Sequence, residues 1–159
     1  MKYHGTVYLF SYKNILFYKL NGATNLETVL MVQDHSKKFI EVQDGPFYLV
    51  YDLSEWDFAP IDTIDYIRKA QYYNLVSGRQ KLFLKMKDNT KDFTINVYLA
   101  DKKIIETADY YQTDEELFDK LSALDLDWRT FKEIYDDFYR TYKNGSNKYL
   151  LKPEDYNAN

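Results

Sequence analysis

Five acidic residues gather in one stretch of this sequence, and their side chains are the ones best suited to chemistry. They are Asp52, Glu55, Asp57, Asp62 and Asp65. Paired carboxylates can transfer protons or bind cations. A carboxylate-based enzyme would need two of Asp52, Asp57 and Asp62 to converge in a pocket with perturbed pKa values. The spacing fits no calcium-binding loop, so a solvated acidic rim is the simpler interpretation.

Other residue types that carry chemistry are sparse. The 2 histidines, His4 and His35, have no second ligand at metal spacing. The sequence contains no Gly-x-Ser-x-Gly elbow, no phosphate-binding glycine loop and no dinucleotide fingerprint. It has no cysteine, which excludes disulfides, thiol nucleophiles and cysteine-based zinc sites and agrees with a reducing compartment. We therefore expect a cytoplasmic protein that is not an enzyme and has no metal site and no cofactor.

Charge and hydropathy narrow the choice of partners. The formal net charge of −4 and the pI of about 5.2 argue against a nucleic-acid binder, which needs a basic face to neutralise phosphates. No run approaches the length of apolar sequence that a membrane span requires. The N-terminus lacks the apolar core of a signal peptide. Partners of other kinds, a protein or a small apolar ligand, stay open.

The elements that must position the acidic stretch alternate in type along the chain. Two strands are predicted within residues 6–20, and Thr24 with Glu27 forms a capping box that opens a helix. An apolar run from Phe47 to Tyr51 is typical of a strand covered on both faces. The predicted helices are 25–42, about 60–77, 113–124 and 125–143, and the predicted strands after the opening hairpin are 47–53, 81–87 and 108–111.

Two segments of the sequence allow two interpretations each. Residues 93–105 alternate like a strand, whereas the crossover that would join two parallel strands favours a helix there. The helix at 125–143 has an aromatic stripe from Trp128 to Tyr142 that either docks on its own domain or offers a face for a homodimer.

We expect one domain over residues 1–143 and a loosely held polar tail over 144–159. The fold class is α/β, with a mixed, largely parallel central sheet flanked by helices.

The acidic stretch also carries a family resemblance. Asp52-Leu53-Ser54-Glu55-Trp56-Asp57-Phe58-Ala59-Pro60 resembles the STAS domain, and more closely its SpoIIAA-like bacterial proteins, in which an apolar strand ends in such a motif before a helix. The segment from Ala108 to Leu117 is similar to the closing strand and acidic helix of that family. The resemblance covers about residues 5–124, so the helix at 125–143 looks like an addition.

The resemblance implies a central position for the strand at 47–53 and a recognition surface in the loop and helix start that follow it. Regulatory STAS domains carry there a serine that a partner kinase phosphorylates. An ungapped carry-over places Asp62 at that serine, with Thr63 beside it. Either Asp62 imitates a permanently charged state or it is simply an acidic residue in the first turn of a helix.

The sequence thus favours a non-catalytic binding or regulatory module. Its predicted contact surface is the loop 54–63, with an exposed Trp56 and Phe58 as apolar anchors for a protein partner. The alternative interpretation of Trp56 is that it folds back to cover the sheet edge. A second hypothesis is a carrier for a small apolar ligand, held in a cleft between the sheet and the helix at 25–42. The contact residues predicted for a partner are Ser54, Trp56, Asp57, Phe58, Asp62 and Thr63.

Overall fold

A five-stranded mixed sheet forms the centre of the molecule, in a computed structural model that describes residues 4–87 and 89–152. The strands lie in the order β1-β2-β3-β4-β5. β1 and β2 form an antiparallel hairpin, and each later strand runs parallel to its neighbour. The strands are β1 (Thr6–Tyr12), β2 (Ile15–Gly22), β3 (Phe47–Trp56), β4 (Arg79–Met86) and β5 (Ala108–Tyr110). The predicted fold class and the central position of β3 are confirmed.

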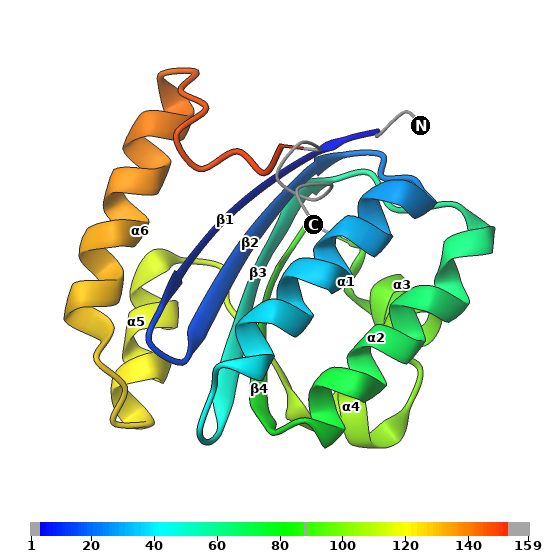
Figure 1. Cartoon of the computed structure of the whole chain (residues 1–159), viewed down its shortest axis with the longest axis horizontal. Coiled ribbons are helices and arrows are strands. Elements are labelled where there is room, and N and C mark those ends of the chain that lie inside the picture. The colour runs from blue at the N-terminus through cyan, green and yellow to red at the C-terminus, as the bar shows by residue number, and fades with distance from the viewer. Residues whose placement is uncertain (1–3, 88, 153–159) are drawn as a thin grey trace.

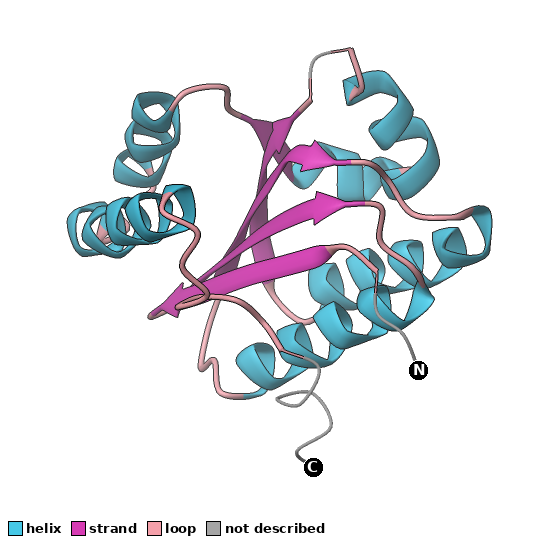
Figure 2. Ribbon diagram, turned by 90° about the horizontal axis from the view of Figure 1, so that it is seen from above, coloured by secondary structure: helices cyan, strands magenta, loops and turns pink. Residues whose placement is uncertain are grey.

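Helices cover both faces of the sheet (Figures 1 and 2). One face carries α1 (Leu26–Glu41), α2 (Ile64–Val76), α4 (Lys102–Thr107) and the short segments α3 (Lys91–Thr94) and η2 (Ile95–Leu99). A single 3-10 turn, η1 (Ile61–Thr63), leads into α2. The other face carries α5 (Asp114–Ala123) and α6 (Trp128–Lys143).

Alternation along the central strands divides the core into two layers. On β3, Leu49 and Leu53 point toward α1 and α2, whereas Tyr48 and Val50 belong to the cluster beneath α5 and α6. Successive strand residues face opposite sides of a sheet, so a strand covered on both sides needs apolar residues at consecutive positions. The run that starts at Phe47 meets this requirement.

The aromatic stripe of α6 docks on its own sheet. Phe131, Tyr135 and Phe138 are at most 1% exposed, and Phe138 packs against Phe17 of β2 with ring centroids 5.2 Å apart. The prediction of docking is therefore confirmed. A homodimer through the same stripe would require these side chains to leave the core.

Residues 93–105, for which strand and helix were both open, are helical. All but Ala100 and Asp101 lie in α3, η2 and α4, and Asp101 caps α4 by accepting from the backbone N–H of Lys103. A crossover is needed because β4 and β5 run parallel, and this requirement outweighs the strand propensity of the segment. Its alternating residues Ile95, Val97 and Leu99 pack on the α1/α2 side of the core.

The chain after α6 departs from the predicted loose tail. Leu9 N donates to Tyr149 O at 3.0 Å, and Leu151 N donates to Val7 O at 2.8 Å. Leu150 pairs with Tyr8 in an antiparallel bridge, and Leu151 is only 6% exposed. The segment up to residue 152 therefore lies along β1, and residues 153–159 of the predicted tail lie outside the described part of the chain.

The N-cap of the first helix is one residue later in the sequence than predicted. Asn25, not Thr24, accepts a hydrogen bond from the backbone N–H of Thr28. The Thr24 hydroxyl instead accepts a hydrogen bond from Trp56 Nε1 at 3.0 Å. Thr24 therefore joins the start of α1 to the end of β3, which is where the predicted contact loop was placed.

Candidate functional site

The six residues predicted to contact a partner do not share one surface. β3 continues to Trp56, so Ser54 and Trp56 lie in the strand instead of the predicted loop. Asp57 and Asp62 are exposed, Ser54 and Phe58 are half-buried, and Trp56 and Thr63 are buried. The expected contact surface is therefore split between the interior and the exterior of the molecule.

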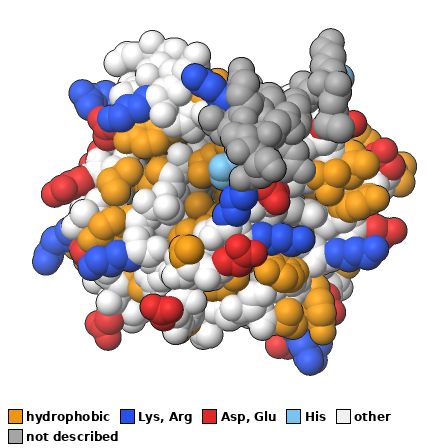
Figure 3. Space-filling view, in the orientation of Figure 1, with side chains coloured by type: hydrophobic (Ala, Val, Ile, Leu, Met, Phe, Trp, Pro, Cys, Tyr) orange, Lys and Arg blue, Asp and Glu red, His pale blue; other side chains and the backbone are white. Residues whose placement is uncertain are grey.

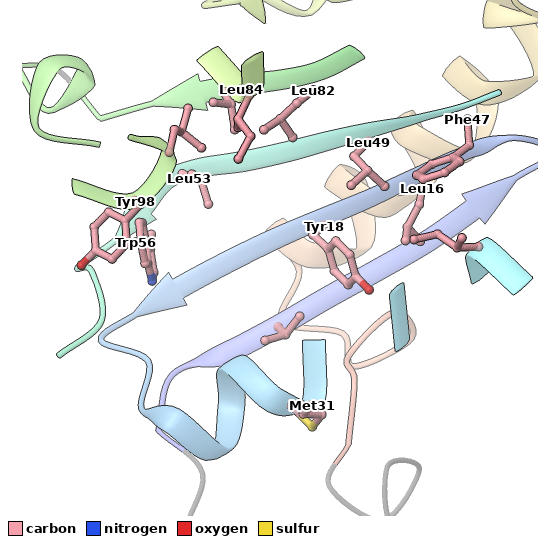
Figure 4. Packing of buried hydrophobic residues seen from close by; sticks show 14 of the residues in the cluster. Leu16, Tyr18, Met31, Phe47, Leu49, Leu53, Trp56, Leu82, Leu84 and Tyr98 are labelled. Atoms are coloured by element: carbon pink, nitrogen blue, oxygen red, sulfur yellow. The ribbon is translucent and has the colours of Figure 1, made fainter. Parts of the chain in front are cut away.

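Trp56 faces inward, which corrects the expectation of an exposed anchor. It is 5% exposed, and its ring centroid lies 5.1 Å from those of both Phe58 and Tyr98. Figure 4 shows Trp56 and Tyr98 side by side in the core. The residues after Asp52 belong to the end of β3, not to a loop, and a β-bulge between Asp52 and Glu55 breaks the alternation and places the indole on the α1/α2 face with Leu53. Trp56 is buried, as in the alternative interpretation, but it lies at the end of the central strand β3 and does not cover an edge of the sheet.

The turn after β3 is held rigidly by its neighbours. Asp57 N donates to Gly22 O at 3.0 Å, and Phe58 O accepts from Thr24 N at 3.1 Å. The Tyr98 hydroxyl bonds both the N–H and the carbonyl of Ala59. Phe58 has a φ of 69°, a region that bulky L-residues rarely enter, so these contacts must offset the strain.

Three residues around the helix start show different degrees of access. Thr63 is 0% exposed and its hydroxyl donates to Pro60 O at 2.6 Å, so it is closed to modification. Asp62 stands in the open in η1, and Ile61 beside it is 87% exposed. Ile61 lies in the 3-10 turn η1, ahead of the regular helix α2, and is turned outward.

Asp52, Asp57 and Asp62 do not converge in one pocket. Asp52 is buried beneath α6, where it accepts from Lys19 Nζ at 3.2 Å, from Ser54 and from the Tyr139 hydroxyl. Asp57 instead pairs with Lys87 at 2.7 Å on the surface. The convergence that a carboxylate-based enzyme would need is thus absent for Asp52, Asp57 and Asp62. Among the described residues, no group of three or more His, Cys, Asp and Glu is placed to hold a metal.

A small apolar cavity lies between the sheet and helices α1 and α2. Its volume is about 100 Å³, and it is partly open to solvent. The apolar wall comes from both helices and the central strands and includes Val29, Val32, Ile67, Ala70, Leu53 and Leu84. Trp56 and Tyr98 also line the cavity. The cleft that the ligand-carrier hypothesis requires, between the sheet and the helix at 25–42, is therefore present in this structure.

One part of the cavity wall is polar. Ser36 of α1, Tyr51 of β3 and Gln71 of α2 line it together, and Ser36 and Gln71 are 3% and 6% exposed. Burial raises the pKa of the Tyr51 hydroxyl, while the Arg79 guanidinium and hydrogen bonds to Gln71 and Ser36 oppose that rise. Behind Gln71, Arg79 donates to Gln71 Oε1. The polar network therefore extends from the cavity wall into the protein.

These wall residues were missed in the sequence. Ser36 and Gln71 stand on otherwise apolar helix faces, and polar residues at buried positions are the signal that was available. Tyr51 belongs to the apolar run that predicts β3, and this pattern does not mark it as a cavity residue. Arg79 follows Gly78 at the start of a strand, a place where an arginine is usually solvated.

Comparison with solved structures recovers the same architecture. An uncharacterised protein of the DUF3478 family from Shewanella loihica PV-4, described as having a SpoIIAA-like fold, matches with a TM-score of 0.57 and 9% identity over 76% of this chain and 96% of that chain. This chain has a SpoIIAA-like fold. The anti-sigma factor antagonist SpoIIAA in its unphosphorylated form also matches, with a TM-score of 0.49 and 13% identity over 73% of this chain and 97% of that chain. No family model and no curated protein matches the sequence.

The SpoIIAA-like fold confirms the resemblance seen in the motif around Asp52. The match leaves part of this chain uncovered, and the assignment of α6 to that added part stays a prediction. Among the described residues, no helix is long and apolar enough to cross a membrane.

Proposed function

We propose that this SpoIIAA-like chain is a non-catalytic binding module that takes a small apolar ligand in the cavity between the sheet and α1/α2. The observation that carries the proposal is the cavity itself, because protein interiors are normally packed with few voids larger than a water molecule. An apolar void forfeits contacts that a ligand would restore. Apolar cavities in proteins accordingly take up small apolar molecules.

A polar atom without a partner supports an occupant that is not purely apolar. Thr94 lines the cavity, is 3% exposed, and its hydroxyl has no hydrogen-bond partner among the described residues. A buried polar group left unpaired costs free energy, so native structures rarely contain one without a reason. A ligand that carries a polar group would provide the missing partner.

Titration with 1-hexanol, followed by chemical shifts of the full chain, tests the ligand-binding function. Ala70 lines the cavity, so Ala70→Leu fills part of the space and should weaken binding by about tenfold, since two or more methylenes of contact are displaced. Ala123→Leu is the matched control, because Ala123 is exposed at the end of α5. If 1-hexanol saturates neither the wild type nor the control, the proposed ligand-binding function is wrong. Native mass spectrometry of the purified protein offers a second check, through a co-purifying mass.

Recognition of a protein partner is the second candidate. The exposed Ile61, next to Asp62 and close in sequence to the Asp57–Phe58 turn, favours it, because an apolar side chain rimmed by carboxylates can anchor and orient a partner. The proposal keeps Asp57, Phe58 and Asp62 as contacts. Trp56 and Thr63 would act from inside, by holding the turn. Figure 3 shows hydrophobic atoms at the surface over α2, between charged groups of both signs.

The partner hypothesis is tested by comparing proteins captured with wild type and with Ile61→Asp. Trp56→Ala is unsuitable because it would disturb the core. Val42→Asp is the control, since Val42 is 74% exposed at the end of α1 and lies outside the proposed surface. Loss of one partner with Ile61→Asp alone supports the proposal. Identical recovery with all three proteins contradicts it.

A further inference from the structure

Arg79 is a buried cation that has no anionic partner in the described part of the chain. Its side chain is 2% exposed, and it donates to Gln71 Oε1 and, at 3.2 Å, to Thr107 Oγ1. Both acceptors are neutral. Its Nε has no hydrogen-bond partner, and no Asp or Glu forms an ion pair with it, among residues 4–87 and 89–152.

Among the described residues, the other buried cation is Lys19, which has the anionic partners that Arg79 lacks. Lys19 is 1% exposed and pairs with Asp52 at 3.2 Å and with Glu55 at 3.4 Å. A charge removed from water is costly unless it is paired and hydrogen-bonded, and Lys19 meets that condition while Arg79 does not. Burial lowers the pKa of the Arg79 guanidinium to about 10, so the group is still charged at neutral pH.

The uncompensated charge lies directly behind the polar wall of the cavity. Gln71 lines the cavity and accepts from Arg79, and Tyr51, also in the wall, is close enough for the guanidinium to act on its hydroxyl. Gln71 Oε1 thus occupies the place of an anionic oxygen in front of the guanidinium. A side-chain rotation of Gln71 would let a ligand oxygen take that hydrogen bond.

We infer that the cavity binds a small hydrophobic carboxylate, with its apolar body among Val29, Val32 and Leu84 and its carboxylate at Tyr51, Gln71 and Arg79. The inference rests on the ligand-binding function proposed above and names the ligand class. Arginine presents a planar fork of donors that suits a carboxylate, and hydrogen bonds between ionised groups are stronger than neutral ones. A single guanidinium balances one negative charge, which favours a carboxylate over a dianionic phosphate. The cavity volume of about 100 Å³ limits the apolar body to a short chain or a single ring.

Hexanoate and 1-hexanol are a matched pair of probes for this inference. They share the chain length and differ in the charged group. We expect the full-length wild type to bind hexanoate about tenfold or more tightly than 1-hexanol at pH 7, measured by calorimetry or chemical-shift titration. This comparison needs no variant and therefore does not depend on the folding of one.

Arg79→Met removes the charge and should abolish the preference for hexanoate while 1-hexanol still binds. Lys81→Met is the control, since Lys81 is a half-buried cation on the same strand and does not line the cavity. Equal affinity of the wild type for both probes, or a preference that survives in Arg79→Met, overturns the inference but leaves the ligand-binding function standing. Binding of neither probe overturns both.

Discussion

Lys19 Nζ lies 3.2 Å from Asp52 Oδ2, and both side chains are 1% exposed beneath α6. The Tyr139 hydroxyl of α6 donates to the same carboxylate, and Ser54 donates to its other oxygen at 2.9 Å through its backbone N–H. The ion pair therefore ties the middle of the sheet to the helix that the resemblance treats as an addition. Because Asp52 is also the first residue of the recognised motif, the motif has a structural role here.

Asp52→Asn should destabilise the protein by about 3 kcal/mol, because it leaves the buried Lys19 with only Glu55, whose side chain is 57% exposed, as its anionic partner. Urea denaturation measures the free energy of unfolding. Asp57→Asn is the control, since the Asp57–Lys87 pair is solvent-exposed and contributes about 1 kcal/mol or less. Equal losses in the two variants would contradict the assigned role of the buried pair.

Because of the Asp52 carboxylate, we expect the free energy of unfolding to depend on pH. Burial alone would raise the pKa of Asp52, but Lys19 and the hydrogen bonds from Ser54 and Tyr139 outweigh it and lower the pKa from its ordinary value. A carboxyl whose pKa is lower in the folded state stabilises the protein above its unfolded pKa, and the contribution is lost as pH falls through the folded pKa. The free energy of unfolding should therefore fall below about pH 4 more steeply in wild type than in Asp52→Asn. Parallel pH profiles would exclude this coupling.

Tryptophan fluorescence can report on the cavity. The chain has 2 tryptophans, Trp56 at the cavity and Trp128 on α6, in the other core. Trp128→Phe leaves Trp56 as the single reporter, with an emission typical of a buried indole, and 1-hexanol should shift or quench it. Trp56→Phe is the matched control, in which the emission of Trp128 should not respond. A response of Trp128 alone would place the ligand on the wrong face of the sheet.

The segment that follows α6 should contribute to stability. Leu151→Ala removes a side chain that is 6% exposed and packs in the α1/α2 core, and we expect a loss of about 2 kcal/mol or more. The amide of Leu9, which donates to Tyr149 O, should exchange faster in the variant. Leu124→Ala, at a residue that is 37% exposed, should cost about 1 kcal/mol or less. No difference between the two variants would mean that the segment adds nothing.

The sequence predicts the sheet better than the site. The strand of Phe47 to Tyr51 is recognisable because a strand buried on both faces needs consecutive apolar residues. Its extension through Ser54 to Trp56 was missed, because polar residues after Asp52 imitate the start of a loop. The N–H of the buried Trp56 indole is paired with Thr24, a residue 32 positions away for which the local pattern predicts a helix cap.

The cavity could not have been predicted in the same way. Its wall combines residues of α1, α2, β3, β4 and the helical crossover, so it exists only once those elements are packed. The expected α/β architecture suggested a cleft beside the helix at 25–42, and the structure contains a cavity there. Arg79, which the ligand inference needs, had no signal in the sequence beyond its presence after Gly78.

The pairing of residues 149–151 with β1 affects how this molecule meets its neighbours. An uncovered outer strand exposes backbone donors and acceptors that can recruit a strand from another molecule and start aggregation. Here the chain's own last described residues occupy that position beside Val7 and Leu9. At the opposite border, β5 is only three residues long and offers little length for such recruitment. Intermolecular strand addition is therefore hindered at both edges of the sheet. Residues 149–151 cover β1 at one edge, and β5 at the other edge is too short to pair well with another strand.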